Sequence, residues 1–290
     1  MPELPEVETI VRGLRRLIVG KRIAGFTSDW ERLTEPEPAA LVAQRVTGAR
    51  IVGARRRGKL AVLDLDTGES LVVSLRMTGR LLVQPASAPL DPYLRARIPL
   101  EDAMELRFAD VRKFGRIVVA PSDALATGAP GTRTARGPLH ERLGIEPLSR
   151  DFTPTRFAEL LRSRARSRLK PLLLDQTFLA GIGNIYANEA LFRAKLHPLR
   201  RAGSLRPRQV AALHAAIRDA LRVAIRLRGA SIDDYRDVRG RRGRMHREFL
   251  VHGREGEPCP RCGAAVRKTW VAGRGTYWCR RCQRTPRRAE

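Results

Sequence analysis

The sequence predicts a multidomain α+β protein, because the apolar pattern changes three times along the chain. A helical period near the start is followed by short apolar runs between turn residues, as in an antiparallel sandwich or barrel. A long stretch of helical periodicity comes next, and all four cysteines lie in the last 32 residues. We therefore expect an N-terminal helix with a β-sandwich, then a helical domain, then a small cysteine module.

The first residues, MPELPEVETI, predict the start of an amphipathic helix. Apolar side chains recur at helical spacing over residues 7–18, and Gly20 suits the end of that helix. Pro2 and Pro5 fit helix-start positions, and the nearby glutamates complement the positive end of the helix dipole. A second interpretation is that the chain end, Pro2-Glu3, is itself a reactive group. The opening residues leave both interpretations open.

Residues 22–120 predict a sheet structure, because apolar runs of strand length alternate with Gly, Asp and Pro. Turn residues separate the runs at hairpin-like intervals, as at Asp66-Thr67-Gly68-Glu69. This spacing favours an antiparallel sandwich or barrel. The runs are RVTGARIVGARR, KLAVLDL, SLVVSL, GRLLVQ, AMELRF and GRIVVA.

From residue 151 onward the apolar spacing becomes helical. Thr153-Pro154 is typical of a helix start, and a long amphipathic stretch over residues 206–229 ends at Gly229. The stretch 230–248 is polar and basic, and we expect a mobile loop there. The predicted domains are residues 2–120 for the sandwich, 121–150 for a Gly-, Pro-, Ala- and Thr-rich linker, 151–249 for the helical domain and 250–286 for the cysteine module.

The net charge predicts a polyanionic partner. Lys and Arg number 56 against 30 Asp and Glu, which gives a charge of +26 over 290 residues. A GC-rich genome would explain the preference for Arg over Lys, but not the excess of bases over acids. Phosphate neutralisation makes nucleic acid the default partner of such a chain. The chain has no secretory pattern and no apolar run of membrane-spanning length, so we expect an intracellular protein.

Two CxxC pairs in the tail predict a metal site. Cys259 and Cys262 are separated by sixteen residues from Cys279 and Cys282. Each pair can present two thiolates to one ion, and the spacer fits a hairpin, so we expect a β-hairpin zinc ribbon with one structural Zn²⁺. A four-thiolate site is closed, so the ion would fold the module and not catalyse. Two redox pairs would need a thioredoxin-like βαβ context, which the sequence lacks.

The motif GIGNIYANEALF indicates a phosphate contact beside a basic chain. Gly181 and Gly183 allow the backbone to approach a ligand closely, and Asn184 can cap the helix that follows. A helix N-terminus with exposed N–H groups binds anions. The structural alternative is a tight corner between helices with no ligand.

The motif DVRKFG places a long donor and an aromatic side chain on one predicted hairpin tip. Phe114 could enter a base stack while Arg112 hydrogen-bonds an unpaired base. Met77, in SLRMTG, is a second apolar residue at a turn. Ordinary packing in the core is the alternative for both apolar side chains.

Together these motifs resemble the formamidopyrimidine-DNA glycosylases, bifunctional repair enzymes related to endonuclease VIII. The motifs occur in the family order from Pro2 to Cys282, nearly the whole chain. They are PELPEVET, RRGK at 56–59, RMTG at 76–79, DVRKFG, GIGNIYANEALF and the C-x₂-C-x₁₆-C-x₂-C tail. The resemblance implies a DNA glycosylase/AP lyase of base excision repair that removes oxidised purines, 8-oxoguanine and formamidopyrimidines, from duplex DNA.

The resemblance implies catalytic groups at the chain end, once the initiator methionine is removed. The secondary amine of Pro2 would attack C1′ of the damaged nucleotide, and the resulting iminium acidifies the sugar for β- and δ-elimination. Glu3 would be the proton-shuttling acid, and Glu6 a supporting carboxylate. Lys59 would contact the lesion-side phosphate and assist elimination. Arg274 of the zinc ribbon would hold the flanking phosphates and serve δ-elimination.

The resemblance also implies a set of DNA contacts. Met77 and Phe114 would fill the gap left by the extruded base, and Arg112 would read the orphaned cytosine. The helical domain would hold phosphates in a helix–two-turn–helix grip. The implied DNA-binding residues are Met77, Tyr93, Arg112, Phe114, Lys170, Gly181, Gly183 and Asn184.

Four positions depart from the family pattern. Ser74 and Tyr93 stand where histidine is frequent, and Val111 replaces a usual proline. Asp233 lies in the presumed lesion-capping loop, near a position that is often basic. The first three bear on phosphate contacts and turn rigidity, and Asp233 bears on lesion specificity.

Two alternatives therefore stay open. One is an endonuclease VIII-like glycosylase for oxidised pyrimidines, and the other is a non-catalytic zinc-ribbon DNA-binding protein. The expected partner is double-stranded DNA with oxidised bases or abasic sites, and no membrane. We expect a monomer in the cytoplasm, associated with the nucleoid through DNA binding.

Overall fold

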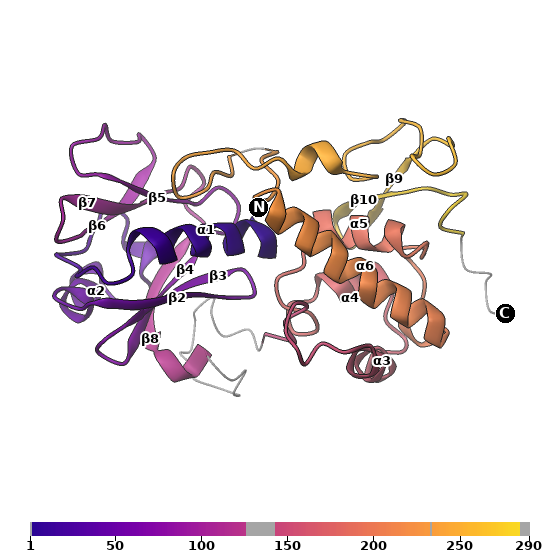
Figure 1. Cartoon of the computed structure of the whole chain (residues 1–290), viewed down its shortest axis with the longest axis horizontal. Helices are drawn as coiled ribbons and strands as arrows, with labels where there is room; N and C mark the ends of the chain where they lie inside the picture. The colour runs from indigo at the N-terminus through magenta and orange to yellow at the C-terminus, as the bar shows by residue number, and fades with distance from the viewer. Residues whose placement is uncertain (1, 126–142, 233, 285–290) are drawn as a thin grey trace. The chain divides into compact units, whose positions relative to one another are not determined.

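The computed structural model describes residues 2–125, 143–232 and 234–284. The chain divides into two compact units (Figure 1). Unit 1 consists of Met1–Arg142 and Ile225–His246, and unit 2 of Leu143–Ala224 and Arg247–Glu290. The predicted linker falls largely on residues 126–142, outside the described residues. The predicted domain bounds stay a prediction, to which the structure adds that residues 225–246 group with the N-terminal part of the chain.

Unit 1 is an antiparallel β-sandwich with an N-terminal helix. Its two four-stranded sheets have the orders β2-β3-β4-β8 and β1-β6-β7-β5. Apolar side chains from both sheets and from α1 share one core, as expected for a sandwich whose inner faces are apolar. The elements are α1 (Leu4–Leu17), β1 (Thr27–Ser28), η1 (Glu31–Leu33), α2 (Ala39–Val46), β2 (Ile51–Arg57), β3 (Leu60–Leu65), β4 (Glu69–Ser74), β5 (Arg80–Pro85), β6 (Leu94–Pro99), β7 (Met104–Ala109), β8 (Arg116–Pro121) and η2 (Ser122–Leu125).

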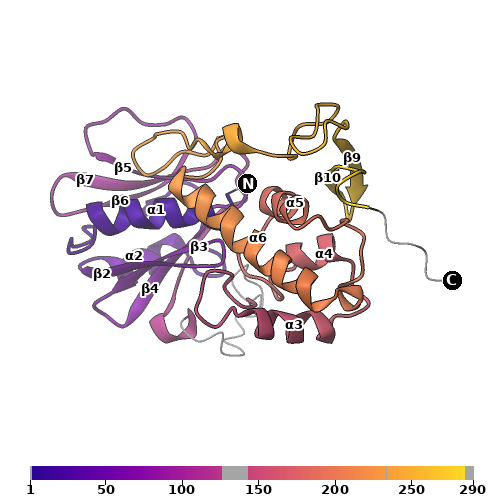
Figure 2. The same ribbon diagram turned by 45° about the vertical axis from the view of Figure 1, so that its right-hand side comes forward.

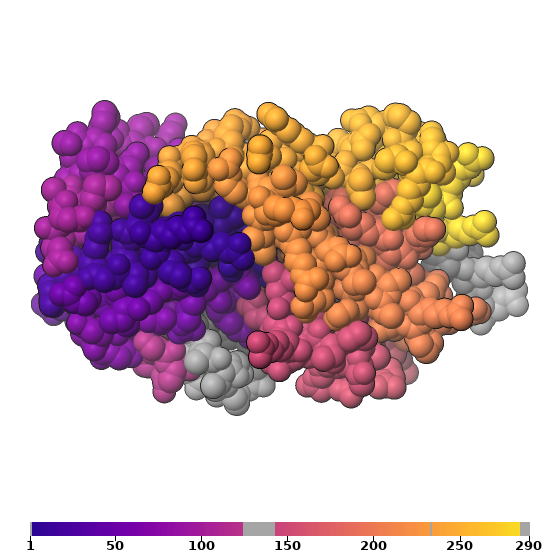
Figure 3. All heavy atoms as spheres, viewed as in Figure 1, coloured from indigo at the N-terminus to yellow at the C-terminus, as the bar shows by residue number. Residues whose placement is uncertain are grey.

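Helix α1 is amphipathic, as its sequence predicts. Val7, Ile10 and Leu14 are buried in the core of unit 1, at the spacing of one helix face. Arg12 and Arg16 lie on the exposed face, and atoms of the helix remain visible in indigo in the space-filling view (Figure 3). The helix begins at Leu4, close to the helix-start signals Pro2 and Pro5, so the chain end itself is tied to regular structure.

Unit 2 combines several helices with a C-terminal β-hairpin (Figure 2). Thr153 caps the first helix through its side chain, which accepts a hydrogen bond from the Arg156 N–H, as predicted. The last two residues of α6, Ile225 and Arg226, belong to unit 1. Helix η4 spans the point after His246 where the chain passes back from unit 1 to unit 2. The elements are α3 (Pro154–Ser163), α4 (Leu169–Leu174), α5 (Asn184–Arg193), η3 (Ala202–Ser204), α6 (Pro207–Arg226), η4 (Met245–Glu248), β9 (Arg267–Val271) and β10 (Arg274–Trp278).

The sandwich, the helical part and the terminal hairpin confirm the predicted fold class. Among the helices of the described residues, none has both the length and the apolar composition that a bilayer span requires.

The stretch 230–248, predicted as a loop from its polar composition, contains two side chains that are buried in the core. Tyr235 and Val238 belong to the core of unit 1, and the Val238 carbonyl accepts a hydrogen bond from the Val83 N–H at 2.9 Å. Val238 also occupies the space above Gly13, where an added Cβ would lie 2.3 Å from its methyl group. Asp233, named above for lesion specificity, lies outside the described residues.

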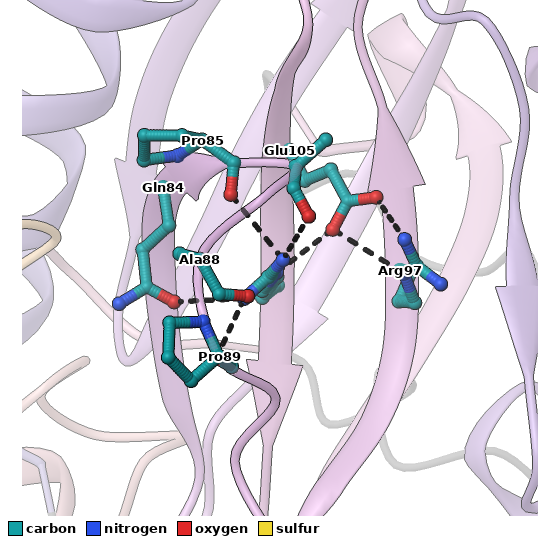
Figure 4. Close-up of polar contacts among 8 residues, drawn as sticks. Gln84, Pro85, Ala88, Pro89, Arg97 and Glu105 are labelled. Atoms are coloured by element: carbon teal, nitrogen blue, oxygen red, sulfur yellow. Dashed lines mark hydrogen bonds and ion pairs between the residues drawn. The ribbon is translucent and has the colours of Figure 1, made fainter.

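A buried arginine fixes the connection between β5 and β6. Arg107 is only 1% exposed, and its Nε–H donates to Glu105 Oε2 at 2.8 Å. Its remaining N–H groups donate to carbonyl oxygens of the β5–β6 connection, and Figure 4 shows those of Pro85, Ala88 and Pro89 beside Glu105. The carbonyl of Ala86 and the side chain of Gln84 complete the set of acceptors. This guanidinium therefore stabilises the chain that leads to Tyr93.

We expect Arg107→Met to lower the free energy of unfolding by about 3 to 5 kcal/mol, because it leaves several buried carbonyls without a donor and removes one of the two guanidinium partners of the buried Glu105. Arg97→Met is the matched control. The Arg97 side chain pairs with the same carboxylate but is 40% exposed, so its loss should cost less than about 1 kcal/mol. Urea denaturation of both variants measures this difference, and similar costs for the two would contradict it.

The same variant has a defined pH dependence. Burial opposes ionisation of Glu105, but hydrogen bonds and charge from Arg97 and Arg107 keep its pKa below the ordinary value. A carboxyl with a lowered pKa in the folded state stabilises the protein above its unfolded pKa of about 4.3, and that stabilisation is lost as pH falls through the folded pKa. The stability difference between wild type and Arg107→Met should therefore shrink in acid.

Candidate functional site

The chain end is held by a buried carboxylate, that of Glu6. Pro2, Glu3 and Glu6 are all buried. The Glu3 N–H donates to Glu6 Oε2 at 2.9 Å, which is one half of a capping box at the start of α1. The other oxygen of Glu6 accepts the Ala230 N–H at 2.7 Å. Glu6 thus ties the first residues to the chain near residue 230 within unit 1, and the predicted pair Pro2-Glu3 is fixed at its backbone.

Two further residues lie next to Glu6. Gly229 has a φ of +75°, and a Cβ at this position would lie 2.7 Å from Glu6 Oε1, so only glycine allows this approach. The Tyr235 hydroxyl donates to the Glu6 carbonyl at 3.3 Å. Burial, and then the charge of Glu6, raise the pKa of Tyr235 well above its ordinary value, so the hydroxyl keeps its proton. Met1 lies outside the described residues, and its removal stays a prediction.

Lys59 lies in a two-residue turn that is fastened to helix α1. Arg57 and Leu60 are paired at the ends of β2 and β3, so Gly58 and Lys59 make the turn, and Gly58 has a positive φ of 56°. The half-buried Arg56 guanidinium donates to the Gly58 carbonyl at 2.9 Å and forms an ion pair of 3.1 Å with Glu8 of α1. The turn that carries Lys59 is therefore coupled to the helix that begins just after Pro2.

Glu8 stays ionised in this link. Burial raises its pKa, but Arg12 and Arg56 together outweigh burial and bring the pKa below the ordinary value. The ion pair with Arg56 therefore persists at neutral pH.

Met77, Arg112 and Phe114 lie together on neighbouring turns of the sandwich. Ser74 pairs with Arg116 in one sheet, and Arg80 pairs with Ala109 in the other, so the β4–β5 and β7–β8 turns lie side by side. Met77 is 39% exposed and Phe114 is 47% exposed. The Arg112 guanidinium lies 4.7 Å from the centre of the Phe114 ring, and its Nη1 is 3.1 Å from Met77 Sδ. The three side chains predicted to enter the base stack form one exposed cluster.

The three other departures from the family pattern, Ser74, Tyr93 and Val111, differ in their exposure to solvent. Ser74 is buried at the end of β4, and Val111 is exposed on the β7–β8 turn. The Tyr93 ring is exposed, while its backbone is fixed by hydrogen bonds with Asp91 and with the Asp110 N–H. Only Tyr93 and Val111 are therefore available at the surface.

In unit 2, a glutamine holds the glycine turn that precedes α5. The Gln176 side chain accepts the Gly181 N–H at 2.9 Å and donates to the Ile182 carbonyl at 2.8 Å. Gly181 has a φ of +92°, which favours glycine at this position. The predicted cap is wrong in one respect. The N-cap residue is Gly183, and Asn184 does not cap α5, because its Nδ2 donates to the Gly275 carbonyl of β10 at 3.0 Å.

Lys170 lies beneath the first turns of α5 and not at the surface. It is fully buried, and its Nζ donates to the Asn184 carbonyl at 3.3 Å and to Asn188 Oδ1. The Asn188 amide lies 2.9 Å from His252 Nδ1. Burial, and then the charge of Lys170, lower the pKa of His252 to about 4, so the neutral ring can accept the amide hydrogen.

The four cysteines are gathered as a Cys₄ metal site requires. Their sulfur atoms all lie within 4.8 Å of one another, with 3.9 Å between Cys259 and Cys282 and 3.5 Å between Cys262 and Cys279. Tetrahedral Zn–S bonds of about 2.3 Å require sulfur–sulfur distances of about 3.8 Å. The Ala264 N–H lowers the pKa of Cys262 to about 7, whereas burial raises the pKa of Cys279 and that of Cys282, so the positions of the sulfur atoms are what support the site. The donor set therefore fits one Zn²⁺.

The hairpin next to the cysteines exposes a basic and an aromatic side chain. Val271 pairs with Arg274, and Ala272 and Gly273 form the turn with φ values of 49° and 68°. Arg274 is exposed at the start of β10, and Trp270 is 72% exposed on β9. The module is joined to the helices by Gln283, whose Nε2 donates to the Leu196 carbonyl at 2.8 Å.

Arg261 of the cysteine module contacts the end of helix α5. Arg261 donates to the Phe192 and Arg193 carbonyls at the end of α5 and stacks 4.5 Å from the Phe192 ring, so it serves as a C-terminal cap.

The sequence-predicted residues therefore form separate groups in the two units. Unit 1 contains Pro2, Glu3, Glu6, Lys59 and the exposed cluster, and unit 2 contains Arg274, the glycine turn and the four cysteines. Sequence reasoning missed Arg56, Gln176, Asn188 and His252, which hold the predicted residues in place. Two adjacent polar residues within the apolar middle of α5, Asn188 and Glu189, are the one signal that could have indicated such a role.

Comparisons with known proteins give one family along nearly the whole chain. The formamidopyrimidine-DNA glycosylase N-terminal domain matches residues 1–117, the H2TH domain of the same enzymes matches residues 143–236, and the zinc finger found in FPG and IleRS matches residues 256–285. A formamidopyrimidine-DNA glycosylase of Roseiflexus sp. (strain RS-1) is 47% identical over 286 residues, which are 98% of this chain and 100% of that protein. The one of Chloroflexus aggregans is 45% identical over 98% of both chains.

Solved structures agree with these matches. The complex between the Lactococcus lactis Fpg and an abasic site containing DNA has a TM-score of 0.88 at 36% identity, covering 98% of this chain and 100% of that one. A complex of a mutant of the same protein with a Fapy-dG containing DNA has the same TM-score and coverage.

Proposed function

The chain belongs to the formamidopyrimidine-DNA glycosylase family, and from this membership and the site we propose a repair function for it. The protein is a DNA glycosylase with AP lyase activity that acts in base excision repair. Its partner is double-stranded DNA with damaged bases or abasic sites, and it contains one structural zinc ion. Its preferred lesions are oxidised purines. The single observation that carries the assignment is the buried Pro2-Glu3 pair, whose backbone is held by the hydrogen bond from the Glu3 N–H to Glu6.

We propose Pro2 as the nucleophile. A secondary amine that attacks C1′ forms an iminium without losing a second proton, and the leaving base departs as the C1′–N bond breaks. The hydrogen bonds from Glu3 N–H and Ala230 N–H to Glu6 support this role, because they fix the approach of the amine. The Glu3 carboxyl, one residue away, would transfer the protons that departure of the base and ring opening of the sugar require.

We propose Lys59 and Arg274 as the phosphate contacts of the elimination steps. The iminium withdraws electrons from the sugar, so a proton is lost from C2′ and the 3′ phosphate leaves, and a second elimination releases the 5′ phosphate. A positive charge near each departing phosphate stabilises the charge that develops on it. The link from Arg56 to Glu8 supports the role of Lys59, because it couples this turn to the helix of the nucleophile.

The remaining predicted residues are proposed DNA contacts with different roles. Met77, Arg112, Phe114 and Tyr93 are exposed and would contact bases or backbone directly. Buried Lys170 would instead act through α5, where it adds positive potential behind the helix N-terminus. Gly181, Gly183 and Asn184 would present that N-terminus to a phosphate. We expect the protein to act inside the cell on the DNA of the nucleoid.

Cleavage of two duplexes tests the lesion preference. One carries 8-oxoguanine opposite cytosine, and the other carries thymine glycol opposite adenine. We expect faster single-turnover cleavage of the first, and borohydride should trap a covalent complex with it. Faster turnover of thymine glycol would replace the purine preference by an endonuclease VIII-like one. Trapping with neither duplex would leave only a DNA-binding protein.

Trp270 should report DNA binding. It is 72% exposed on the hairpin that also carries Arg274, while Trp278 is buried and Trp30 is half-buried. In a Trp30→Phe background, we expect a duplex with an abasic-site analogue to quench the indole emission, because bases and sugars would cover the ring. The same titration with Trp270→Phe should lose most of the change. An unchanged titration would place the hairpin away from the DNA.

A further inference from the structure

The turns that carry Met77, Arg112 and Phe114 are joined through one buried carboxylate. Asp110, at the end of β7, is 0% exposed. Its Oδ2 accepts the N–H groups of Phe114 and Gly115 at 2.9 and 2.8 Å. Its Oδ1 accepts the Arg112 N–H at 3.2 Å. Three backbone donors of the β7–β8 turn therefore converge on a single side chain.

The neighbouring β4–β5 turn is bound to the same carboxylate through Thr78. The Thr78 hydroxyl donates to Asp110 Oδ1 and accepts the Arg112 N–H at 3.1 Å. Thr78 is the residue directly after Met77. A hydroxyl is both donor and acceptor, so this one group bridges the two turns.

Both turns contain backbone conformations that need such support. Arg76 has a φ of 51° and Lys113 a φ of 54°, a left-handed backbone conformation that is unfavourable for residues with a side chain. At Gly115 a Cβ would lie 2.3 Å from the Phe108 ring and 3.2 Å from Asp110 Oδ2, so the turn passes this point only as glycine. The hydrogen bonds to Asp110 offset this cost only while both turns keep their shape.

We propose that Asp110 and Thr78 are positioning residues that assemble Met77, Arg112 and Phe114 into one wedge before DNA binds. The stacking of Arg112 on Phe114 and its contact with Met77 are then present in the free protein. Ordering these side chains in advance lowers the entropy cost of inserting them into the duplex. The inference rests on the proposed function, since it concerns how the glycosylase reaches its base.

The wedge acts only in the step in which the base leaves the stack of the duplex. Asp110 and Thr78 touch no reacting group, and the wedge replaces a base that has left the stack. An abasic site in single-stranded DNA has no stack to enter and no orphaned base to read. Loosening the wedge should therefore slow cleavage at a lesion in a duplex and spare cleavage of the single strand.

Thr78→Val and Thr78→Ser form a matched pair for the test, because valine keeps the shape and serine keeps the hydroxyl. We expect Thr78→Val to lower the single-turnover rate on an 8-oxoguanine:cytosine duplex about tenfold, and the rate on a single-stranded abasic site by less than about twofold. Thr78→Ser should restore the duplex rate. Asp110→Asn should lose more than Thr78→Val, because its amide hydrogens would face backbone donors.

Amide hydrogen exchange of the free protein tests the inference independently of any measurement of DNA cleavage. The amides of Arg112, Phe114 and Gly115 should exchange faster in Thr78→Val than in wild type, and at the wild-type rate in Thr78→Ser. Equal exchange in all three proteins would overturn the proposal, as would equal losses on the two substrates. A wild-type protein that cleaves neither substrate would count against the proposed function, while the exchange result would still judge the wedge.

Discussion

Pro2→Gly should lower borohydride trapping on lesion-containing DNA by about 100-fold, while the affinity for the same DNA stays within about twofold. After removal of the methionine, glycine still offers an amine, but a primary one with a freer backbone. Its Schiff base can lose the remaining N–H proton and become a neutral imine, which withdraws electrons less strongly than the iminium of proline, and glycine lacks the ring that fixes the direction of the nitrogen lone pair. The loss therefore tests the chemistry and not the charge of the chain end.

Two controls separate the amine from the fold. A preparation that keeps the initiator methionine has an acylated Pro2 nitrogen and should trap nothing, although its sequence is wild type. Pro5→Ala changes the second proline of the same motif, which lies inside α1 and takes no part in the proposed chemistry. This variant should trap normally if it folds, as thermal denaturation can verify. Strong trapping by the methionine-retaining form would mean that another residue is the nucleophile. Lys59 would then be the first residue to substitute.

The sequence predicts most of this fold because the periodic signals are local. Helix α1, the strands of the apolar runs and the terminal hairpin all follow from spacing along a few residues. Strand β6, Leu94–Pro99, is not among the predicted runs because LRARIP contains no continuous apolar run, although its alternation of apolar residues with arginine is itself typical of a half-buried strand. Helix α2, Ala39–Val46, was missed because two turns of helix give too short a period to distinguish from a strand.

The positioning contacts could not be predicted, because their partners are distant in sequence. Glu6 meets Ala230, Asn188 meets His252, and Asn184 meets Gly275, and nothing near either member of a pair indicates the other. The incorrect cap at Asn184 has the same cause. The residue type suits a cap, but a carbonyl of the hairpin takes the side chain instead. The motifs indicate which residues could carry the chemistry. The residues that hold them in place can be identified only from the folded structure.

Removal of zinc should reduce DNA affinity at least about 100-fold and unfold the terminal hairpin. The apolar cluster around the cysteines is small, with Phe192, Val251 and Val266 as its other buried members. A cluster of this size cannot offset the chain entropy of the module, whereas a structural Zn²⁺ contributes about 10 to 16 kcal/mol in small zinc domains. Without the ion, Arg274 and the Asn184–Gly275 hydrogen bond would lose their fixed positions.

Arg274→Ala is the matched control, because it removes one phosphate contact from a folded hairpin. Fluorescence anisotropy at fixed salt should show a loss of about tenfold for this variant, smaller than the loss on treatment with a chelator. Cys279→Ser should resemble the chelated protein, and added Zn²⁺ should restore the wild type but not this variant. Since α1 and the β-sandwich have their own core, thermal unfolding of unit 1 should change little. Full DNA affinity in metal-free protein would mean that the hairpin folds through its own contacts, and the four cysteines would then need another explanation.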